Sequence, residues 1–231
     1  MNADERWDAT RPSRRYPKGD RRRAEIVRAA FGAFANGGYR GSSMVQIAEA
    51  CGVSRAGLLH HFPSKDLLLA AVLEERDRIN GELFFAGMAP RTAGVDYFRR
   101  LIRVVEHNTA QREIVSLFAT LSTEATDPDH PAHAYFSNRY RWLRADIADA
   151  LTDLADRGLL RADVRADGLD ADLIALIDGL QIQWLIDAQS VDVPARLRRR
   201  LGELLTPASQ EHPVPWFDDC PELDNPRTPS P

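Results

Sequence analysis

Residues 42–65 constrain the fold more than any other stretch of this 231-residue chain, because they begin a pattern of two short helices joined by a tight turn. Met44, Ile47 and Ala48 form an apolar i, i+3, i+4 set, and Ser43 stands directly before them as an N-cap. These residues predict a short helix over about residues 43–50.

A turn and a second short helix follow. Gly52 can adopt the left-handed backbone conformation that ends a helix, and Ser54 can cap the next one. Leu58, Leu59 and Phe62 give this second helix an apolar side. Two helices of this length around a glycine turn form a helix-turn-helix, whose second helix enters the major groove of DNA. The stretch therefore predicts a DNA-binding element.

Further motifs surround this element at fixed spacing. They are Gly37-Gly38-Tyr39, Ser43, Ile47-Ala48, Gly52-Val53-Ser54, His60-His61-Phe62 and Lys65. With these motifs, the run from Arg23 to Leu69 resembles the N-terminal DNA-binding domain of the TetR family of bacterial transcriptional regulators. One residue departs from the family pattern, because Leu59 stands where the family usually has a tyrosine. A contact from that hydroxyl to DNA is therefore absent.

The resemblance implies an all-α protein with a three-helix DNA-binding domain and a larger C-terminal helical domain for ligand binding and dimerisation. It also implies a homodimeric repressor that binds a pseudo-palindromic operator and is released by a small-molecule effector. The alternative is a dimeric small-molecule-binding or scaffold protein without specific DNA binding, and Leu59 is its support.

Charge is segregated along the chain. Residues 1–66 hold 12 lysines and arginines against 7 aspartates and glutamates, a net of +5, whereas the remainder holds 18 against 27, a net of −9. A basic N-terminal domain beside an acidic body directs phosphate contacts to one end. The sequence contains no nucleophile elbow, P-loop, dinucleotide fingerprint or zinc-protease motif, so we expect neither an enzyme nor a cofactor.

Composition also indicates a compartment. The two cysteines, Cys51 and Cys220, are far apart and have no flanking pattern, which favours neither a disulfide framework nor a metal site. The apolar runs are too short to span a bilayer, and the N-terminus shows no secretory signal. We therefore expect a soluble, cytoplasmic protein.

Four segments are expected. Residues 1–19 form a flexible basic arm that contacts DNA or is simply a solvated tail. Residues 20–65 form the helix-turn-helix domain, in which the first helix runs from Asp20 to Gly37-Gly38. Residues 66–205 form the effector-binding and dimerisation domain. Residues 206–231 contain 7 prolines and form a disordered or loosely packed tail.

Helical periodicity predicts the elements of the body, at about residues 64–85, 95–110, 112–126, 132–157, 169–188 and 195–205. The carboxylates of the 132–157 helix are interpreted as a solvated face rather than as catalytic groups. The 169–188 helix is apolar nearly all round, so we expect one side to meet its own core and the other a partner subunit. Candidate residues of the dimer interface are Tyr140, Leu143, Ile147, Leu173, Ile177, Leu180 and Trp184.

Candidate DNA contacts lie in and around the two short helices. Arg55 is the best base reader, because its guanidinium can bond guanine O6 and N7. Ser43 and Lys65 are placed to hold phosphates at helix starts. For His61 a phosphate contact and packing against the first helix stay equally open. The full candidate set is Arg40, Ser43, Ser54, Arg55, Ala56, Gly57, His60, His61 and Lys65.

A mostly apolar effector cavity with a few polar groups is the expectation for the body. Its candidate residues, each of which is alternatively ordinary core, are Tyr97, Leu101, Asn108, Phe118, Leu121, Ser122 and Gln181. Asp127, Asp129, His130 and His133 fit no standard zinc spacing and are interpreted as a loop before a helix, so no metal is expected.

Overall fold

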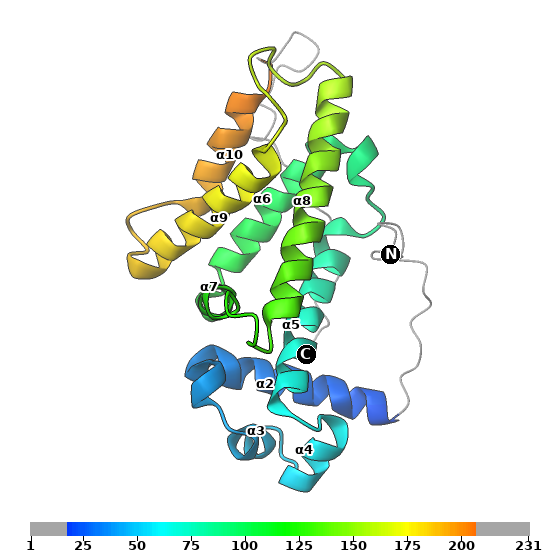
Figure 1. Cartoon of the computed structure of the whole chain (residues 1–231), viewed down its shortest axis with the longest axis vertical. Helices are drawn as coiled ribbons and strands as arrows, with labels where there is room; N and C mark the ends of the chain where they lie inside the picture. Colours follow the sequence, from blue (N-terminus) through cyan, green and yellow to red (C-terminus); the bar gives the residue numbers. More distant parts are fainter. Residues whose placement is uncertain (1–17, 207–231) are drawn as a thin grey trace, which may run out of the picture. The chain divides into compact units, whose positions relative to one another are not determined.

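The computed structural model describes residues 18–206, whose regular elements are all helical, which confirms the predicted fold class (Figure 1). The α-helices are α2 (Lys18–Gly41), α3 (Met44–Ala50), α4 (Arg55–His61), α5 (Lys65–Asn80), α6 (Gly94–Thr109), α7 (Arg112–Glu124), α8 (His133–Asp156), α9 (Leu169–Ile186) and α10 (Val193–Leu204). A π-helical segment, η1 (Gly81–Phe85), continues α5, and a 3₁₀ turn, η2 (Pro90–Thr92), precedes α6.

The predicted element boundaries agree with these helices to within a few residues. The first helix begins at Lys18 rather than at Asp20, so the last residues of the predicted arm are helical, and residues 1–17 lie outside the described range. Gly38 interrupts the helical geometry of α2 with φ 67° and ψ 173°, at the glycine pair predicted to end it. Of the predicted proline-rich tail, Thr206 alone is described, and its N–H donates to the Leu159 carbonyl over 2.8 Å.

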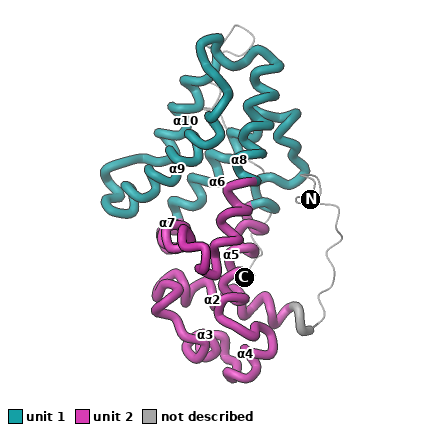
Figure 2. Tube along the Cα trace, viewed as in Figure 1, with its two compact units in different colours: residues 1–8, 81–110, 142–231 teal, residues 9–80, 111–141 magenta. Residues whose placement is uncertain are grey.

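The described chain forms two compact units (Figure 2). Unit 2 comprises residues 18–80 and 111–141, and unit 1 comprises residues 81–110 and 142–206. In unit 2, one apolar core joins the helix-turn-helix to α5, α7 and the start of α8, and it includes Ile26, Phe34, Ile47, Leu58, Phe62, Leu69, Leu121 and Phe136. The packing units therefore do not follow the predicted division after residue 65, which stays a functional assignment.

A polar clasp joins α5 to α8 inside unit 2. The Asp77 carboxylate accepts a hydrogen bond from the Tyr135 hydroxyl over 2.6 Å and pairs with the Arg139 guanidinium. Burial raises the pKa of the Tyr135 hydroxyl well above its usual range, so this group stays a donor. Arg139 also lies over the ring of Phe118, 5.3 Å from its centroid. Arg139 therefore has both an acidic and an aromatic partner within unit 2.

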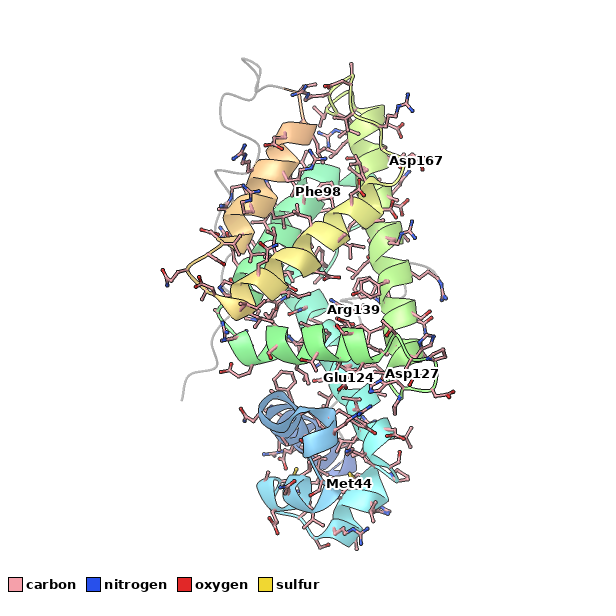
Figure 3. The ribbon with its side chains drawn as sticks, turned by 60° about the vertical axis from the view of Figure 1, so that its left-hand side comes forward. Met44, Phe98, Glu124, Asp127, Arg139 and Asp167 are labelled. Atoms are coloured by element: carbon pink, nitrogen blue, oxygen red, sulfur yellow. The ribbon has the colours of Figure 1, made fainter. Side chains whose placement is uncertain are left out.

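In unit 1, α10 packs against α6 and α9, and Phe98 on α6 is fully buried (Figure 3). The prediction that the carboxylates of α8 form a solvated face is wrong for Asp146 and Asp153, which are buried. The Oδ2 of the buried Asp153 accepts the N–H of Gly94 over 2.8 Å at the start of α6. A carboxylate that receives a backbone N–H can lie inside without losing its hydrogen bonds.

Candidate DNA-binding surface

Both short helices begin at a serine cap, as predicted. Ser43 Oγ accepts the N–H of Gln46 over 3.2 Å, and Gln46 Oε1 accepts the N–H of Ser43 over 2.9 Å, which completes a capping box at α3. Ser54 Oγ accepts the N–H of Gly57 over 3.0 Å at α4. A hydroxyl that accepts a hydrogen bond still has its own proton to donate. Capping and phosphate contact are therefore compatible at both serines.

The turn between α3 and α4 has the predicted left-handed glycine, because Gly52 has φ 63°. Arg22 on α2 holds this turn from outside. Its Nη2 donates to the carbonyls of Cys51 and Gly52 over 3.1 and 3.2 Å, and its Nη1 donates to Glu25 over 2.7 Å. Arg22 was not identified from the sequence. Its three-residue spacing from Glu25 could have indicated an ion pair on one face of α2.

The recognition helix α4 has a buried side and an outward side. Leu58 and Phe62 are 0% and 1% exposed, as predicted for core residues, whereas Arg55 and Ala56 are exposed. The side of α4 that carries Arg55 is therefore open to a partner. Arg23 on α2 lies over the Phe62 ring, 4.6 Å from its centroid, which brings a further exposed cation beside the end of α4.

The remaining predicted contacts differ in exposure. Ser43, Ser54, Arg40 and His60 are exposed, whereas Gly57 and His61 are partly buried. The rings of His60 and His61 meet edge to face with centroids 5.5 Å apart. This contact does not decide between the two interpretations of His61.

Lys65 has a structural role that the sequence did not show. Its Nζ donates to the carbonyls of Tyr39 and Ser42 over 2.8 and 3.0 Å and lies 4.2 Å from the centroid of the Tyr39 ring. An ammonium has three N–H donors, so the two carbonyls leave one for a phosphate. Lys65 therefore fixes the connection from α2 to α3, where Arg40 and Ser43 lie.

The predicted effector residues divide between the two units. Tyr97, Leu101, Asn108 and Gln181 belong to unit 1, and Phe118, Leu121 and Ser122 belong to unit 2. Leu121 is fully buried in the core that contains the helix-turn-helix, and Ser122 Oγ donates to the Ala119 carbonyl. These two residues therefore have clear structural roles.

The predicted dimer residues also divide by burial. Ile147, Leu173 and Leu180 are buried within the single chain, so they offer little surface to a partner. Tyr140, Leu143, Ile177 and Trp184 are partly exposed. Sequence reasoning left out the most exposed apolar residues of α9, Ile182 and Ile186.

The histidines and aspartates before α8 engage local backbone groups. Asp127 Oδ1 accepts the N–H of Asp129, and His133 Nδ1 lies 2.8 Å from the Ala125 carbonyl oxygen. Between residues 18 and 206, the structure has no group of three His, Cys, Asp or Glu residues arranged to hold a metal. In the same range, no helix is long and apolar enough to cross a membrane.

Two capped short helices around a left-handed glycine, with the second helix open on one side, define a helix-turn-helix DNA-binding protein. The family model for bacterial regulatory proteins of the TetR family matches residues 26–72, and the model for the C-terminal domain of BetI-type transcriptional repressors matches residues 99–207. The chain belongs to the TetR family of transcriptional regulators, and it binds DNA rather than catalysing a reaction.

Individual relatives agree with this family. The transcriptional repressor AcnR of Corynebacterium diphtheriae is 30% identical over 166 residues, which cover 68% of this chain and 78% of AcnR. The regulator RutR of Escherichia coli K12 is 46% identical over 50 residues, 22% of this chain and 24% of RutR. A transcriptional regulator of Saccharomonospora viridis, solved in complex with choline, is 27% identical with a TM-score of 0.65, covering 81% of this chain and 99% of that structure.

Proposed function

We propose that this protein is a homodimeric transcriptional repressor that binds a pseudo-palindromic operator and releases it when a small molecule binds the C-terminal domain. The observation that carries the proposal is the outward side of α4, where Arg55 is exposed above the buried Leu58 and Phe62. A recognition helix anchored in this way presents its first residues to base edges. In this proposal the protein acts in the bacterial cytoplasm, where the operator lies.

Each predicted contact receives a role in this proposal. Arg55 reads a guanine in the major groove, and Ala56 and Gly57 allow close approach of the backbone. The other contacts hold phosphates, through Arg40, Ser43, Ser54, His60 and the third N–H of Lys65, with His61 as a further candidate. The capped serines and the Lys65 bonds to Tyr39 and Ser42 support these roles, because they fix the segments that carry them.

Dimerisation through α9 is part of the proposal. Ile182 and Ile186 are exposed on a helix whose Leu173 and Leu180 are buried, so α9 has apolar surface left for a second copy. Two recognition helices related by a two-fold axis require DNA with the same symmetry. We propose that Ile182, Ile186 and the partly exposed Ile177 and Trp184 form the interface.

We propose a small organic cation as the effector. The Saccharomonospora viridis relative was solved with choline, a quaternary ammonium compound. In this chain, unit 1 contains the buried carboxylate of Asp146, one helical turn after Trp142 on α8. Carboxylates and aromatic faces are the groups that stabilise quaternary ammonium ions. Tyr97, Leu101, Asn108 and Gln181 of the same unit remain the proposed lining.

The first experiment captures operator DNA. Purified protein is mixed with fragmented DNA from its own source at near-physiological salt, and the retained fragments are sequenced. Enrichment of an inverted repeat supports the proposed repressor. Uniform retention that vanishes with added salt indicates nonspecific phosphate attraction and contradicts it.

The second experiment tests the effector class. Choline is titrated into the protein bound to its operator, and release is followed by fluorescence anisotropy. We expect release by choline and a loss of at least about tenfold in choline potency for Asp146→Asn, because the charge partner is removed. Asp149→Asn on the same helix serves as the matched control and keeps the wild-type potency. Release by choline that is equal in Asp146→Asn and the wild type excludes Asp146 from the site.

A further inference from the structure

The turn between α7 and α8 contacts the DNA-binding helices at one aromatic pair. The ring of His130, in this turn, meets the ring of Tyr39 on α2 edge to face, with centroids 5.6 Å apart and an interplanar angle of 71°. Ala125 and Ala132, on either side of His130, are buried in the same core as Phe34 and Ile47. Glu124 and Asp127 mark this turn in Figure 3. The turn is therefore packed against the helix-turn-helix within unit 2.

Tyr39 connects this turn to the DNA contacts. Its hydroxyl donates to Asp66, and its carbonyl and ring both receive Lys65 Nζ. Burial, followed by the hydrogen bond to Asp66, raises the pKa of the Tyr39 hydroxyl well above its usual range, so this donor persists. Arg40 follows Tyr39 directly in the chain, and Ser43 is four residues after Tyr39. Any displacement of Tyr39 therefore displaces two proposed phosphate contacts.

The contacts of His130 require its Nδ1 to accept a hydrogen bond and therefore to carry no proton. The backbone N–H of Ala132 donates to His130 Nδ1 over 3.2 Å, so Nδ1 carries no proton in this arrangement. Nε2 lies 3.5 Å from Glu124 Oε2, and both atoms are buried without a hydrogen-bond partner. The His130 side chain is 8% exposed. The imidazole thus has a backbone donor on one nitrogen and a carboxylate near the other.

Protonation of this ring conflicts with the contact at Nδ1. A proton on Nδ1 opposes the Ala132 N–H, which then loses its acceptor in a buried position. Glu124 on α7 attracts the resulting cation, whereas Lys65 on α5 repels it. Asp127, Asp129 and His133 are titratable side chains near His130 in the sequence, and Asp66 on α5 accepts the Tyr39 hydroxyl. A proton on Nδ1 therefore weakens the contact of His130 with Ala132, while the attraction to Glu124 remains.

We propose that His130 is a protonation-sensitive positioning residue, which holds Tyr39 and the α2–α3 connection in place when neutral and releases them when protonated. The proposal rests on the proposed DNA-binding function, since operator affinity is one of its readouts. It makes this regulator a sensor of acid as well as of its effector. Operator affinity is highest at neutral pH and falls on acidification.

The operator experiment compares pH profiles. Affinity is measured by anisotropy from about pH 8 to about pH 5.5, the range in which histidines titrate. His130→Asn keeps an acceptor for the Ala132 N–H and has no proton to gain in this range, so it retains operator affinity at neutral pH. On acidification, the fold-loss of operator affinity is about five to ten times smaller in this variant than in the wild type. His130→Phe, which keeps the ring but lacks the acceptor, is the second variant and has an equally shallow profile.

The matched control is His107→Asn, the same change at a histidine of unit 1. It keeps the wild-type profile, and because His60 and His61 are present in all the variants, they contribute equally to every profile. Identical profiles for the wild type and His130→Asn overturn the proposal. Failure of the wild-type protein to bind any specific DNA instead contradicts the proposed function.

A second readout does not depend on DNA. In the free protein, the amide signal of Ala132 is followed by NMR as the pH is lowered. We expect this signal to shift on acidification in the wild type and to stay constant in His130→Asn. An Ala132 amide that does not respond to His130 overturns the proposal, whatever the result with operator DNA.

Discussion

At the scale of the residue, Arg55 carries the sequence specificity of the proposed DNA contact. Its side chain is exposed while Leu58 and Phe62 anchor the same helix, so Arg55→Ala removes a contact without disturbing the core. We expect a loss of about 1–3 kcal/mol on the operator, confined to one base position in each half-site. Binding to a set of operators with single base changes measures this loss.

The control for Arg55 is Arg28→Ala, because Arg28 is an exposed arginine on α2, outside the recognition helix. Arg28→Ala keeps the base preference of the wild type. An equal loss for Arg55→Ala on every sequence identifies Arg55 as a phosphate contact and contradicts its role as a base reader.

Residue roles were predictable from the sequence where both partners lie close together in the chain. The caps at Ser43 and Ser54 bond groups three residues away, so their motifs were sufficient. The contacts of Arg22 with Cys51 and of Asp77 with Arg139 join residues 29 and 62 positions apart. Such contacts depend on how helices pack, which a helical pattern in one segment does not specify.

At the scale of the element, the start of α6 depends on a glycine that approaches α8. A Cβ at Gly94 would lie 2.4 Å from the Ala150 carbonyl oxygen and 3.1 Å from Leu154 Cγ. Because the nearest atom belongs to the backbone of a helix, it cannot move aside cheaply. We expect Gly94→Ala to lower the free energy of unfolding by about 1–3 kcal/mol, as overpacked cores do. Denaturant unfolding followed by circular dichroism measures this change.

The matched control is Gly202→Ala in α10, where a Cβ would meet nothing within 4 Å. Alanine has the higher helix propensity, so this variant is unchanged or more stable. If both variants unfold at the same denaturant concentration, the close approach of Gly94 to α8 has no energetic consequence, and the packing argument is wrong.

The positions of the helices could be predicted from periodicity, but the burial or exposure of their charged side chains could not. The α8 pattern predicted the helix within a few residues, yet Asp153 is buried and accepts a hydrogen bond from Gly94, 59 residues earlier. A row of aspartates has the same sequence pattern whether water or a backbone N–H satisfies it. The burial of Asp146 and Asp153 was therefore outside the reach of the sequence.

At the scale of the whole molecule, the family and fold class followed from motifs at fixed spacing, whereas the packing units did not. A helix-turn-helix signature depends on local turns and caps, so it can be recognised from one sequence alone. The core that joins Phe34 and Ile47 to Leu121 and Phe136 depends on contacts between distant segments. For the same reason, the burial of Ile147 and Leu173 within one chain did not follow from their helical pattern.

The assembly itself gives the last prediction. Ile186 at the end of α9 is 81% exposed, so replacing it by aspartate leaves the core of the single chain intact. If α9 joins two copies, the charge lies in an apolar interface, and the dimer dissociation constant rises by about thirtyfold or more. Sedimentation velocity measures this change, and operator binding weakens with it because one subunit reaches one half-site.

Leu83→Asp, at an exposed apolar residue of η1, remains dimeric as the control. An Ile186→Asp protein that sediments as the wild-type dimer places the interface away from this end of α9, since an unpaired carboxylate is costly to bury in an apolar contact.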